Sequence, residues 1–408
     1  MNMFRLVWLG RSLSLLGEYI QFLALPLWIQ HVTGSPVAGL ATFAIFYLPQ
    51  VICTPLAGVI ADRFDRGRVV IAVDLAAFAV AASMALTIDE HRLGLVYLHL
   101  AALQVLGALG VPAFMSLLPD LVPDDRLLAA NSLLNASAGV AITVGPLIGT
   151  TMLAHGSITA VIWANALTYL MGAASMLVRL PGRAPASAVN PPRGWGLSAM
   201  RVGLKAVLTD PVLRSTIAAE ASWMLFFGAA MQLVLMQIGN GGNSHAGLLG
   251  VGSGLGSLIM TTLLARTRRD VSPARLFLVS VTTTAPLTLV VALLVGGTGP
   301  AVFALLAGLI LGVQSYLVII GPTMHCQRRA EPGVRGRVTA VRRTSRALWQ
   351  VVGVALAALL AHWLSPLVIL TVGGILATVT ATPWAWRAFR ASLVVTSDSE
   401  AMIQAGAV

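Results

Sequence analysis

The chain has 408 residues, of which 57% are hydrophobic and only 10% are charged. A soluble domain has about 25% charged residues, so this composition excludes an ordinary water-soluble protein. The net charge of +11 does not indicate nucleic-acid binding, because the basic residues lie in short loops between apolar stretches, where anionic lipid headgroups are the expected partners.

Apolar stretches long enough to cross a bilayer, which takes about 20 residues, recur along nearly the whole chain. The prediction is an all-α integral membrane protein with twelve transmembrane helices. The first stretch lacks a small-residue cleavage site, so we interpret it as a span and not as a signal peptide. We place the spans at residues 4–31, 37–60, 69–88, 94–118, 127–154, 157–178, 212–238, 246–265, 274–296, 301–323, 338–362 and 367–386.

The basic residues are distributed asymmetrically. Of the 26 Lys and Arg residues, all but Arg11 and Arg92 fall in or beside alternate loops or near the chain ends. Loops rich in Lys and Arg stay in the cytoplasm. We therefore expect a multi-pass protein of the bacterial plasma membrane with both termini in the cytoplasm.

The middle of the chain separates two groups of six spans. Residues 179–196 are rich in Pro, Gly and Arg, which is typical of a linker, and 197–208 have the pattern of a short amphipathic helix on the membrane surface. The predicted organisation is a six-helix bundle at 1–178, a cytoplasmic linker at 179–211, a second bundle at 212–386 and a cytoplasmic tail at 387–408.

A weak internal repeat supports two pseudo-symmetric bundles. One offset carries Gly145 of the fifth span onto Gly353 of the eleventh, and His155 to within a residue of His362. Hydropathy alone would also align any two groups of six spans. Transporters built from such repeats bind their substrates at the pseudo-symmetry axis.

Among the ionisable residues inside the spans, three stand out by their depth: Arg11 and Glu18 in the first span and Glu220 in the seventh. A charge at the centre of a membrane helix costs about 2.5–3.5 kcal/mol, so these are functional candidates. We predict that Glu18 accepts the coupling proton, because burial favours a neutral carboxyl. Arg11 would set the local field and form with Glu220 a pair that breaks during transport. The alternative is a static Arg11–Glu18 pair.

The segment from Gly58 to Arg68, GVIADRFDRGR, joins the second and third spans. It resembles the loop motif of the major facilitator superfamily, G-x-L-A-D-R-x-G-R-[RK], with Asp65 in place of Gly and Gly67 in place of a basic residue. The alternative is a loop that is basic only for topology. The DRFDR sequence, and the run from Arg11 to Glu18, which resembles R-x-x-S-x-x-G-D, are similar to the branch of drug, macrolide and siderophore exporters.

The resemblance implies a cytoplasmic gate that holds the two bundles together. Gly58 would permit close helix contact, Asp62 would meet a helix N-terminus of the other half, and Arg63 and Arg66 would pair with Asp120. Arg68 and Arg346 complete the predicted gate.

The fifth span contains Gly145, Pro146 and Gly149 and resembles the antiporter motif of exporting members, G-x-x-x-G-P-x-x-G-G, with Ala141 and Thr150 as departures. The alternative is a generic packing helix. The fourth span lacks the Arg found in many drug–proton antiporters, so their coupling scheme does not transfer directly.

In the resembled fold the first, fourth, seventh and tenth spans line a central cavity. Each candidate lining residue is equally compatible with a hydrogen bond or packing between helices. The candidates are Gln21, His99, Gln104, Trp223, Phe227, Gln232, Gln314 and Tyr316.

The resemblance implies a monomeric secondary transporter that exports an amphipathic drug-like or natural-product compound by alternating access. Its energy source would be the proton gradient, without a cofactor. The alternatives are a siderophore or metabolite exporter, a nutrient importer and a lipid flippase. The cluster Arg342, Arg343 and Arg346 would either attract anionic substrates or serve topology. The sequence contains no nucleotide-binding loop, serine elbow or metal-ligand cluster, so we expect neither an enzyme nor an ATP-driven pump.

Overall fold

The computed structural model describes residues 2–123, 126–177, 196–240, 243–266, 272–296, 302–331 and 334–404, and every regular element in these ranges is helical. Most of the predicted linker at 179–196 lies outside them. Side chains are also left undescribed in parts of some helices, including residues 54–63.

Helices coincide with all twelve predicted spans. The N-terminal group is α1 (Asn2–Thr33), α2 (Pro36–Arg63), α3 (Arg66–Thr87), α4 (Leu93–Leu121), α5 (Leu127–His155) and α6 (Ile158–Leu177), with a 3-10 turn at Glu90–Arg92. The C-terminal group is α8 (Pro211–Trp223), a π-helical turn (Met224–Gly228), α9 (Ala229–Asn240), α10 (Asn243–Arg266), α11 (Pro273–Val295), α12 (Val302–Arg329), α13 (Arg335–Leu360) and α14 (Pro366–Gln404). The amphipathic helix is α7 (Gly196–Thr209).

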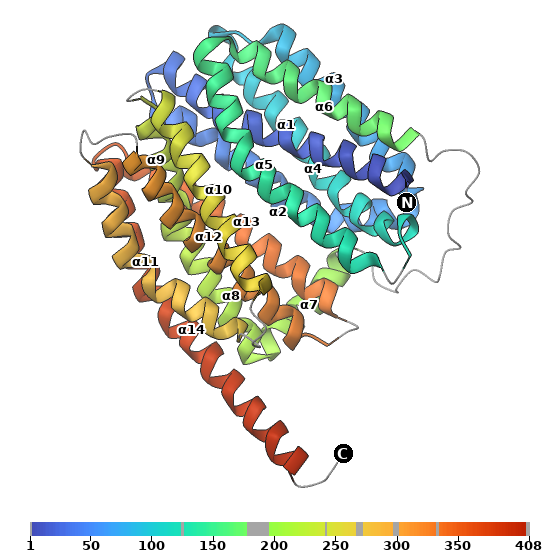
Figure 1. The fold of residues 1–408 in the computed structure, drawn as a ribbon, viewed down its shortest axis with the longest axis vertical. Helices are drawn as coiled ribbons and strands as arrows, with labels where there is room; N and C mark the ends of the chain where they lie inside the picture. Colours follow the sequence, from blue (N-terminus) through green and yellow to red (C-terminus); the bar gives the residue numbers. More distant parts are fainter. Residues whose placement is uncertain are drawn as a thin grey trace.

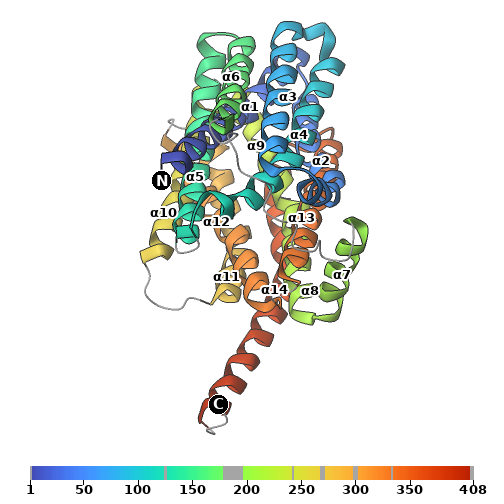
Figure 2. The same cartoon turned by 90° about the vertical axis from the view of Figure 1, so that its right-hand side faces the viewer.

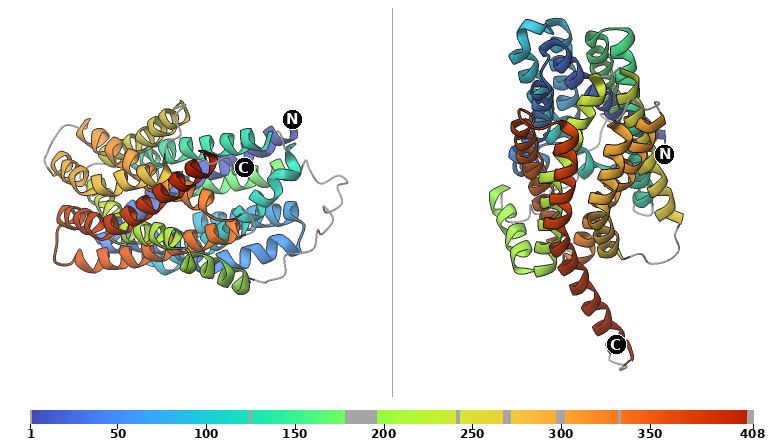
Figure 3. Two further views of the ribbon diagram at one scale, coloured as in Figure 1. Left: turned by 90° about the horizontal axis from the view of Figure 1, so that it is seen from below. Right: turned by 90° about the vertical axis from the view of Figure 1, so that its left-hand side faces the viewer.

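Two features depart from the predicted boundaries. The seventh span is not one continuous α-helix, because the π-helical turn separates α8 from α9. The last helix, α14, continues to Gln404, so the predicted tail from residue 387 is helical over most of its length and projects away from the other helices (Figure 3).

Ten helical segments in the described part of the chain are long and apolar enough to cross a membrane. The helices α10 and α13 fall outside this group. The apolar part of α10, Leu248–Leu264, is shorter than the others, and the first half of α13 is rich in arginine.

Aspartates begin two helices at sharp chain turns. The Asp65 carboxylate accepts a hydrogen bond of 2.8 Å from the backbone N–H of Arg68 and so caps α3. Asp210 caps α8 in the same way through the N–H of Val212, at 2.7 Å. Such caps satisfy backbone donors that the first helical turn leaves unpaired. This explains why Asp65 replaces the usual glycine of the loop motif.

The helices form two groups that meet along two main seams and at a further contact of α9 with α1 and α2. In the first group α1 packs on α5 and α6, and α3 packs on α4 and α6; in the second, α12 packs on α10 and α11, and α14 on α8 and α11. Figure 1 shows the first group in blue to green above the second in light green to red. The groups touch where α5 meets α10 and where α2 meets α13, on opposite sides of the molecule (Figure 2).

Glycines allow several helices to approach closely. A Cβ on Gly145 or Gly149 of α5 would overlap the backbone of α1 at Tyr19 and Ile20. A Cβ on Gly353 of α13 would overlap the backbone of the π-helical turn at Leu225. The internal repeat aligned Gly145 with Gly353, and the two glycines have equivalent packing roles. Each allows its helix to pack closely against the first membrane-spanning segment of its own half.

The contact of α1 and α2 with α9, near the C-terminal end of α1, is apolar. Leu27 of α1 and Phe43 of α2 belong to one buried cluster with Leu233 and Val234 of α9. Apolar packing of this kind joins the two halves without any charged group.

Two ion pairs are buried between helices. The Arg11 Nη1 atom of α1 lies 3.0 Å from Asp74 Oδ1 of α3. The Arg342 Nη1 atom of α13 lies 2.6 Å from Glu220 Oε1 of α8, and these side chains are only 5% and 2% exposed. Both pairs join helices of the same half.

Gly149→Ala is expected to lower the thermal unfolding temperature of the purified protein in detergent. The added methyl group would overlap the Ile20 carbonyl, and overpacking typically costs about 1–3 kcal/mol. Gly139→Ala is the matched control in the same helix, because a Cβ there meets nothing within 4 Å. Equal unfolding temperatures for the two variants would contradict this packing.

Arg342→Met is expected to destabilise the protein strongly, because it leaves the Glu220 carboxylate buried without its partner, and such losses cost about 3–5 kcal/mol. The double variant Arg342→Met/Glu220→Met should recover part of the unfolding temperature. Arg329→Met is the control, since the Arg329–Asp210 pair is 37% and 21% exposed and should matter little. If the double variant were no more stable than Arg342→Met, the cost of the single variant would not come from the unpaired Glu220 carboxylate.

Candidate functional site

A cavity of about 230 Å³ lies between the two halves of the protein. Its walls come from α1, α2 and α5 on one side and from α8–α9, α10, α12 and α13 on the other. Four aromatic residues are among those that line it: Tyr19, Phe22, Tyr47 and Trp223. Gln232 of α9 donates a hydrogen bond of 3.3 Å to the Tyr47 hydroxyl of α2 and so links the halves across the cavity.

A second cavity of about 260 Å³ adjoins the first and shares Tyr19, Phe22 and Gln50 with it. It lies among α1, α2, α4 and α13. Of the described residues on its walls, Glu18 of α1 and Arg343 of α13 carry charged side chains. A carboxyl of one half and a guanidinium of the other therefore face the same space.

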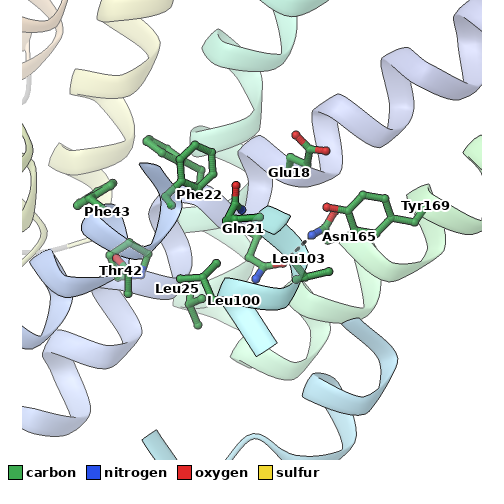
Figure 4. A pocket seen from close by; sticks show the side chains of 13 residues that line it. Glu18, Gln21, Phe22, Leu25, Thr42, Phe43, Leu100, Leu103, Asn165 and Tyr169 are labelled. Atoms are coloured by element: carbon green, nitrogen blue, oxygen red, sulfur yellow. Dashed lines mark hydrogen bonds between the residues drawn. The ribbon is translucent and has the colours of Figure 1, made fainter. Parts of the chain in front are cut away.

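The Glu18 side of the site continues into a small pocket within the N-terminal half. Figure 4 shows Glu18 and Gln21 on α1 together with Asn165 and Tyr169 from α6. The Asn165 amide donates a hydrogen bond of 2.6 Å to Gln21 Oε1. Within the described part of the chain, no Lys or Arg lies within 4.0 Å of the Glu18 carboxyl, so the expected alternative of a static Arg11–Glu18 pair is not formed.

The predicted Arg11–Glu220 pair is wrong for this structure. Arg11 binds Asp74 and lies over the Phe114 ring at 5.2 Å, inside the N-terminal half. Glu220 binds Arg342 inside the C-terminal half. Each charge finds its partner within its own bundle because a pair formed there keeps both groups out of lipid and out of the cavity. Neither residue lines the described cavities.

Four of the predicted lining residues do reach the cavity walls. Trp223 and Gln232 line the first cavity, Gln104 lines the second, and Gln21 lines the small pocket beside Glu18. The π-helical turn follows Trp223 directly and contributes Met224 and Gly228 to the first cavity. Such turns are often found at functional sites in helices.

The other four predicted lining residues lie elsewhere. His99 contacts Ser83 of α3 at 3.1 Å. Gln314 hydrogen-bonds Ser280 and Thr284 of α11. Phe227 is buried behind Trp223, with ring centroids 4.9 Å apart. Tyr316 is not among the residues that line the described cavities.

These misplacements have a common cause. In a membrane helix apolar residues face lipid as well as the protein core, so hydropathy does not reveal which side faces a cavity.

The gate motif is partly visible. Arg66 Nη1 lies 4.0 Å from Asp120 Oδ2, as predicted, and donates to the Ser116 carbonyl at 2.8 Å. The Arg68 side chain is exposed. The packing of Gly58 and the side chains of Asp62 and Arg63 lie outside what the structure describes, so their predicted contacts stay predictions.

Arg346, predicted as part of the gate, lies on a cavity wall in this structure, and its gate role stays a prediction. Its side chain lines the first cavity, together with Gln350 one turn further along α13. Of the three clustered arginines, Arg342 is buried in an ion pair, Arg343 faces the second cavity and Arg346 faces the first. Successive side chains of a helix point about 100° apart, so these three arginines of one cluster reach three different surroundings.

The motif of α5 is joined directly to this site. Gly145 and Gly149 hold α5 against α1 at Tyr19 and Ile20, immediately after Glu18. Pro146 lines the first cavity. Sequence reasoning missed Tyr47, Gln50 and Arg343 as wall residues. The arginines within a predicted span were a signal for Arg343, whereas nothing in the sequence singled out the other two.

Comparison with known proteins agrees with this architecture. The family model described as Major Facilitator Superfamily matches residues 7–354. An uncharacterized MFS-type transporter, YfiS, of Bacillus subtilis (strain 168) is 25% identical over 363 residues, which cover 87% of this chain and 86% of that protein. Macrolide efflux protein A of Streptococcus pyogenes is 23% identical over 380 residues, which cover 88% and 91%.

Solved structures support the same fold. A bacterial homologue of the iron transporter ferroportin, crystallised in an inward-facing state, matches with a TM-score of 0.72 at 15% identity, covering 94% of this chain and 98% of that one. The family model matches most of this chain, and the shared fold agrees with that match. This multi-pass membrane protein therefore belongs to the Major Facilitator Superfamily of transporters.

Proposed function

We propose that the protein is a secondary active transporter with twelve membrane spans that exports an amphipathic drug-like or natural-product compound by proton-coupled alternating access. It would act as a monomer in the bacterial plasma membrane with both termini in the cytoplasm. The observation that carries this proposal is a cavity walled by both halves, with a buried carboxyl, Glu18, on the wall of the adjoining cavity.

The packing supports alternating access. Each half has a buried cluster and a buried ion pair of its own, whereas one further apolar cluster spans the two halves. The contacts within each half would let it move as a unit. The halves touch along α5–α10 and α2–α13. Rocking about these seams would open the cavities to one side and then to the other, as in transporters built from repeated bundles.

Glu18 is the proposed proton acceptor. Removing a carboxylate from water favours its protonated form, and Arg343 of the other half faces the same cavity. An ionised Glu18 would attract Arg343 of α13 when the two halves approach each other across this cavity, whereas a protonated Glu18 would not. Protonation would therefore change the relative stability of two arrangements of the halves, which is what coupling requires.

The direction of transport rests on two similarities. The α5 motif resembles that of exporters, and its glycines hold the helix against α1 beside Glu18. A relative similar over most of the chain is a macrolide efflux protein. Siderophore or metabolite export, nutrient import and lipid flipping are the alternatives that transport measurements would separate.

Cells that express the protein should accumulate less radiolabelled erythromycin, or less of another compound in a panel of amphipathic drugs and dyes, than cells without it. Collapse of the proton gradient by an ionophore should abolish the difference, because the gradient drives uphill export. Cells carrying the empty vector provide the baseline. Higher accumulation with the protein would indicate import, and a difference that survives the ionophore would exclude proton coupling.

Glu18→Gln should reduce gradient-driven transport at least tenfold in proteoliposomes while leaving exchange of the same compound across the membrane measurable. The amide resembles the protonated carboxyl but cannot release a proton. Glu90→Gln is the control, since Glu90 lies in an exposed 3-10 turn and its charge should not matter. Unchanged uphill transport in Glu18→Gln would refute the assignment.

A further inference from the structure

Among the described residues that line the first cavity, Arg346 is the one that carries a charge. In the described chain it forms no ion pair and no hydrogen bond. Its neighbour Arg342, one turn earlier on α13, is instead neutralised by Glu220 at 2.6 Å. Arg343, between them in sequence, faces the cavity that contains Glu18. Arg346 is therefore the one arginine of the cluster whose cavity offers no acidic residue.

A guanidinium without an ion-pair partner is costly at this depth. The Glu220 carboxylate attracts Arg346 only at longer range, because it is bound to Arg342. Arg346 lies eleven positions after the start of α13 at Arg335, about 16 Å along the helix axis. Charges within membrane spans are expensive unless they pair or face water or a ligand. Topology explains arginines in loops, but it does not explain one on the wall between two halves. The arrangement indicates that its counter-charge arrives with a ligand.

The surrounding groups fit an anion attached to an apolar body. Tyr47 accepts a hydrogen bond from Gln232 at 3.3 Å, which leaves its own O–H able to donate. Gln350 follows Arg346 by one turn on the same cavity wall. A guanidinium binds carboxylate, sulfonate or phosphate oxygens in paired, charge-assisted hydrogen bonds.

The rest of the first cavity is apolar and aromatic. Phe22 and Trp223 provide rings from opposite halves, and Met231 and Ile319 provide flexible and branched aliphatic surface. Aromatic and aliphatic walls with a few polar groups at one place are typical of sites that orient a small amphipathic molecule.

We propose that the first cavity binds an amphipathic anion and that Arg346 recognises its charged group, with the Tyr47 hydroxyl as a second donor. This rests on the proposed transport function and names the substrate class: a carboxylate, sulfonate or phosphate on an aromatic or aliphatic body. Glu18 and Arg343 lie in the adjoining cavity, so proton binding and anion recognition use separate charged groups.

The test is equilibrium binding of three probes that share one fluorophore: dansylglycine (anionic), dansylamide (neutral) and dansylcadaverine (cationic). The full-length protein is placed in phosphatidylcholine nanodiscs, and energy transfer from tryptophan reports binding. We expect dansylglycine to bind at least roughly tenfold more tightly than dansylamide, and Arg346→Gln to remove this preference. Arg346→Lys should retain part of it, because a point charge remains without the paired geometry.

Arg335→Gln is the matched control: it removes the same charge from the same helix at an exposed position and should leave all three affinities unchanged. If Arg346→Gln does not fold, the wild-type affinity for dansylglycine must still weaken with added salt while that for dansylamide does not. Equal dansylglycine binding by wild type and Arg346→Gln, or tightest binding of dansylcadaverine, would overturn the proposal.

Replacing part of the phosphatidylcholine by phosphatidylglycerol distinguishes the source of the anion. Competition with dansylglycine assigns the site to a lipid headgroup, and no competition assigns it to a soluble amphiphile; both results support an anion site. Binding needs no proton gradient, so its failure is separable from failure of transport. Proton-driven export of a cation that is unaffected by Arg346→Gln would leave the proposed function intact and refute this inference.

Discussion

The cost of an uncompensated charge at membrane depth governs how this protein is arranged. Arg11 and Glu220, which lie deep in apolar helices, are each neutralised within their own half by Asp74 and Arg342. A buried pair adds little net stability, but removal of one partner is expensive. The pairs therefore tie neighbouring helices of one bundle together and leave the space between the bundles to a small number of other charges.

Those remaining charges divide between two adjoining cavities. Glu18 and Arg343 approach one cavity from opposite halves, and Arg346 stands in the other among aromatic and amide groups. The first arrangement suits a proton that changes the attraction between the halves. The second suits a ligand that brings its own negative charge. The two cavities share Tyr19, Phe22 and Gln50 as wall residues. A ligand or proton bound in one cavity would therefore contact or neighbour side chains that also line the other.

Close helix packing gives these charges fixed positions. Glycines of α10 and α12 face each other's backbones, with Gly252 and Gly256 on one helix and Gly308 and Gly312 on the other. Small residues spaced by four positions permit such contact in membranes, where helix association depends on packing. In α5 the same device holds α1 so that Glu18 reaches the cavity wall. The motif that resembles an exporter signature is thus, in physical terms, the support of the proposed proton site.

Hydropathy and the arginine-rich loops were enough to predict where the long helices lie, because length and apolar content are properties of each segment alone. The cost of burying a charge pointed to Glu18. The resemblance to the family fold, in which the first, fourth, seventh and tenth spans line a cavity, pointed to Gln21, Gln104, Trp223 and Gln232. Local sequence could not reveal the partners of Arg11 and Glu220, nor that His99 and Gln314 bond to neighbouring helices. It also did not predict the π-helical turn, or that Arg342 forms a buried ion pair while Arg343 and Arg346 line different cavities. The partner of a charged side chain and the direction in which it points depend on how helices distant in the chain are rotated and packed. Only the tertiary structure decides these.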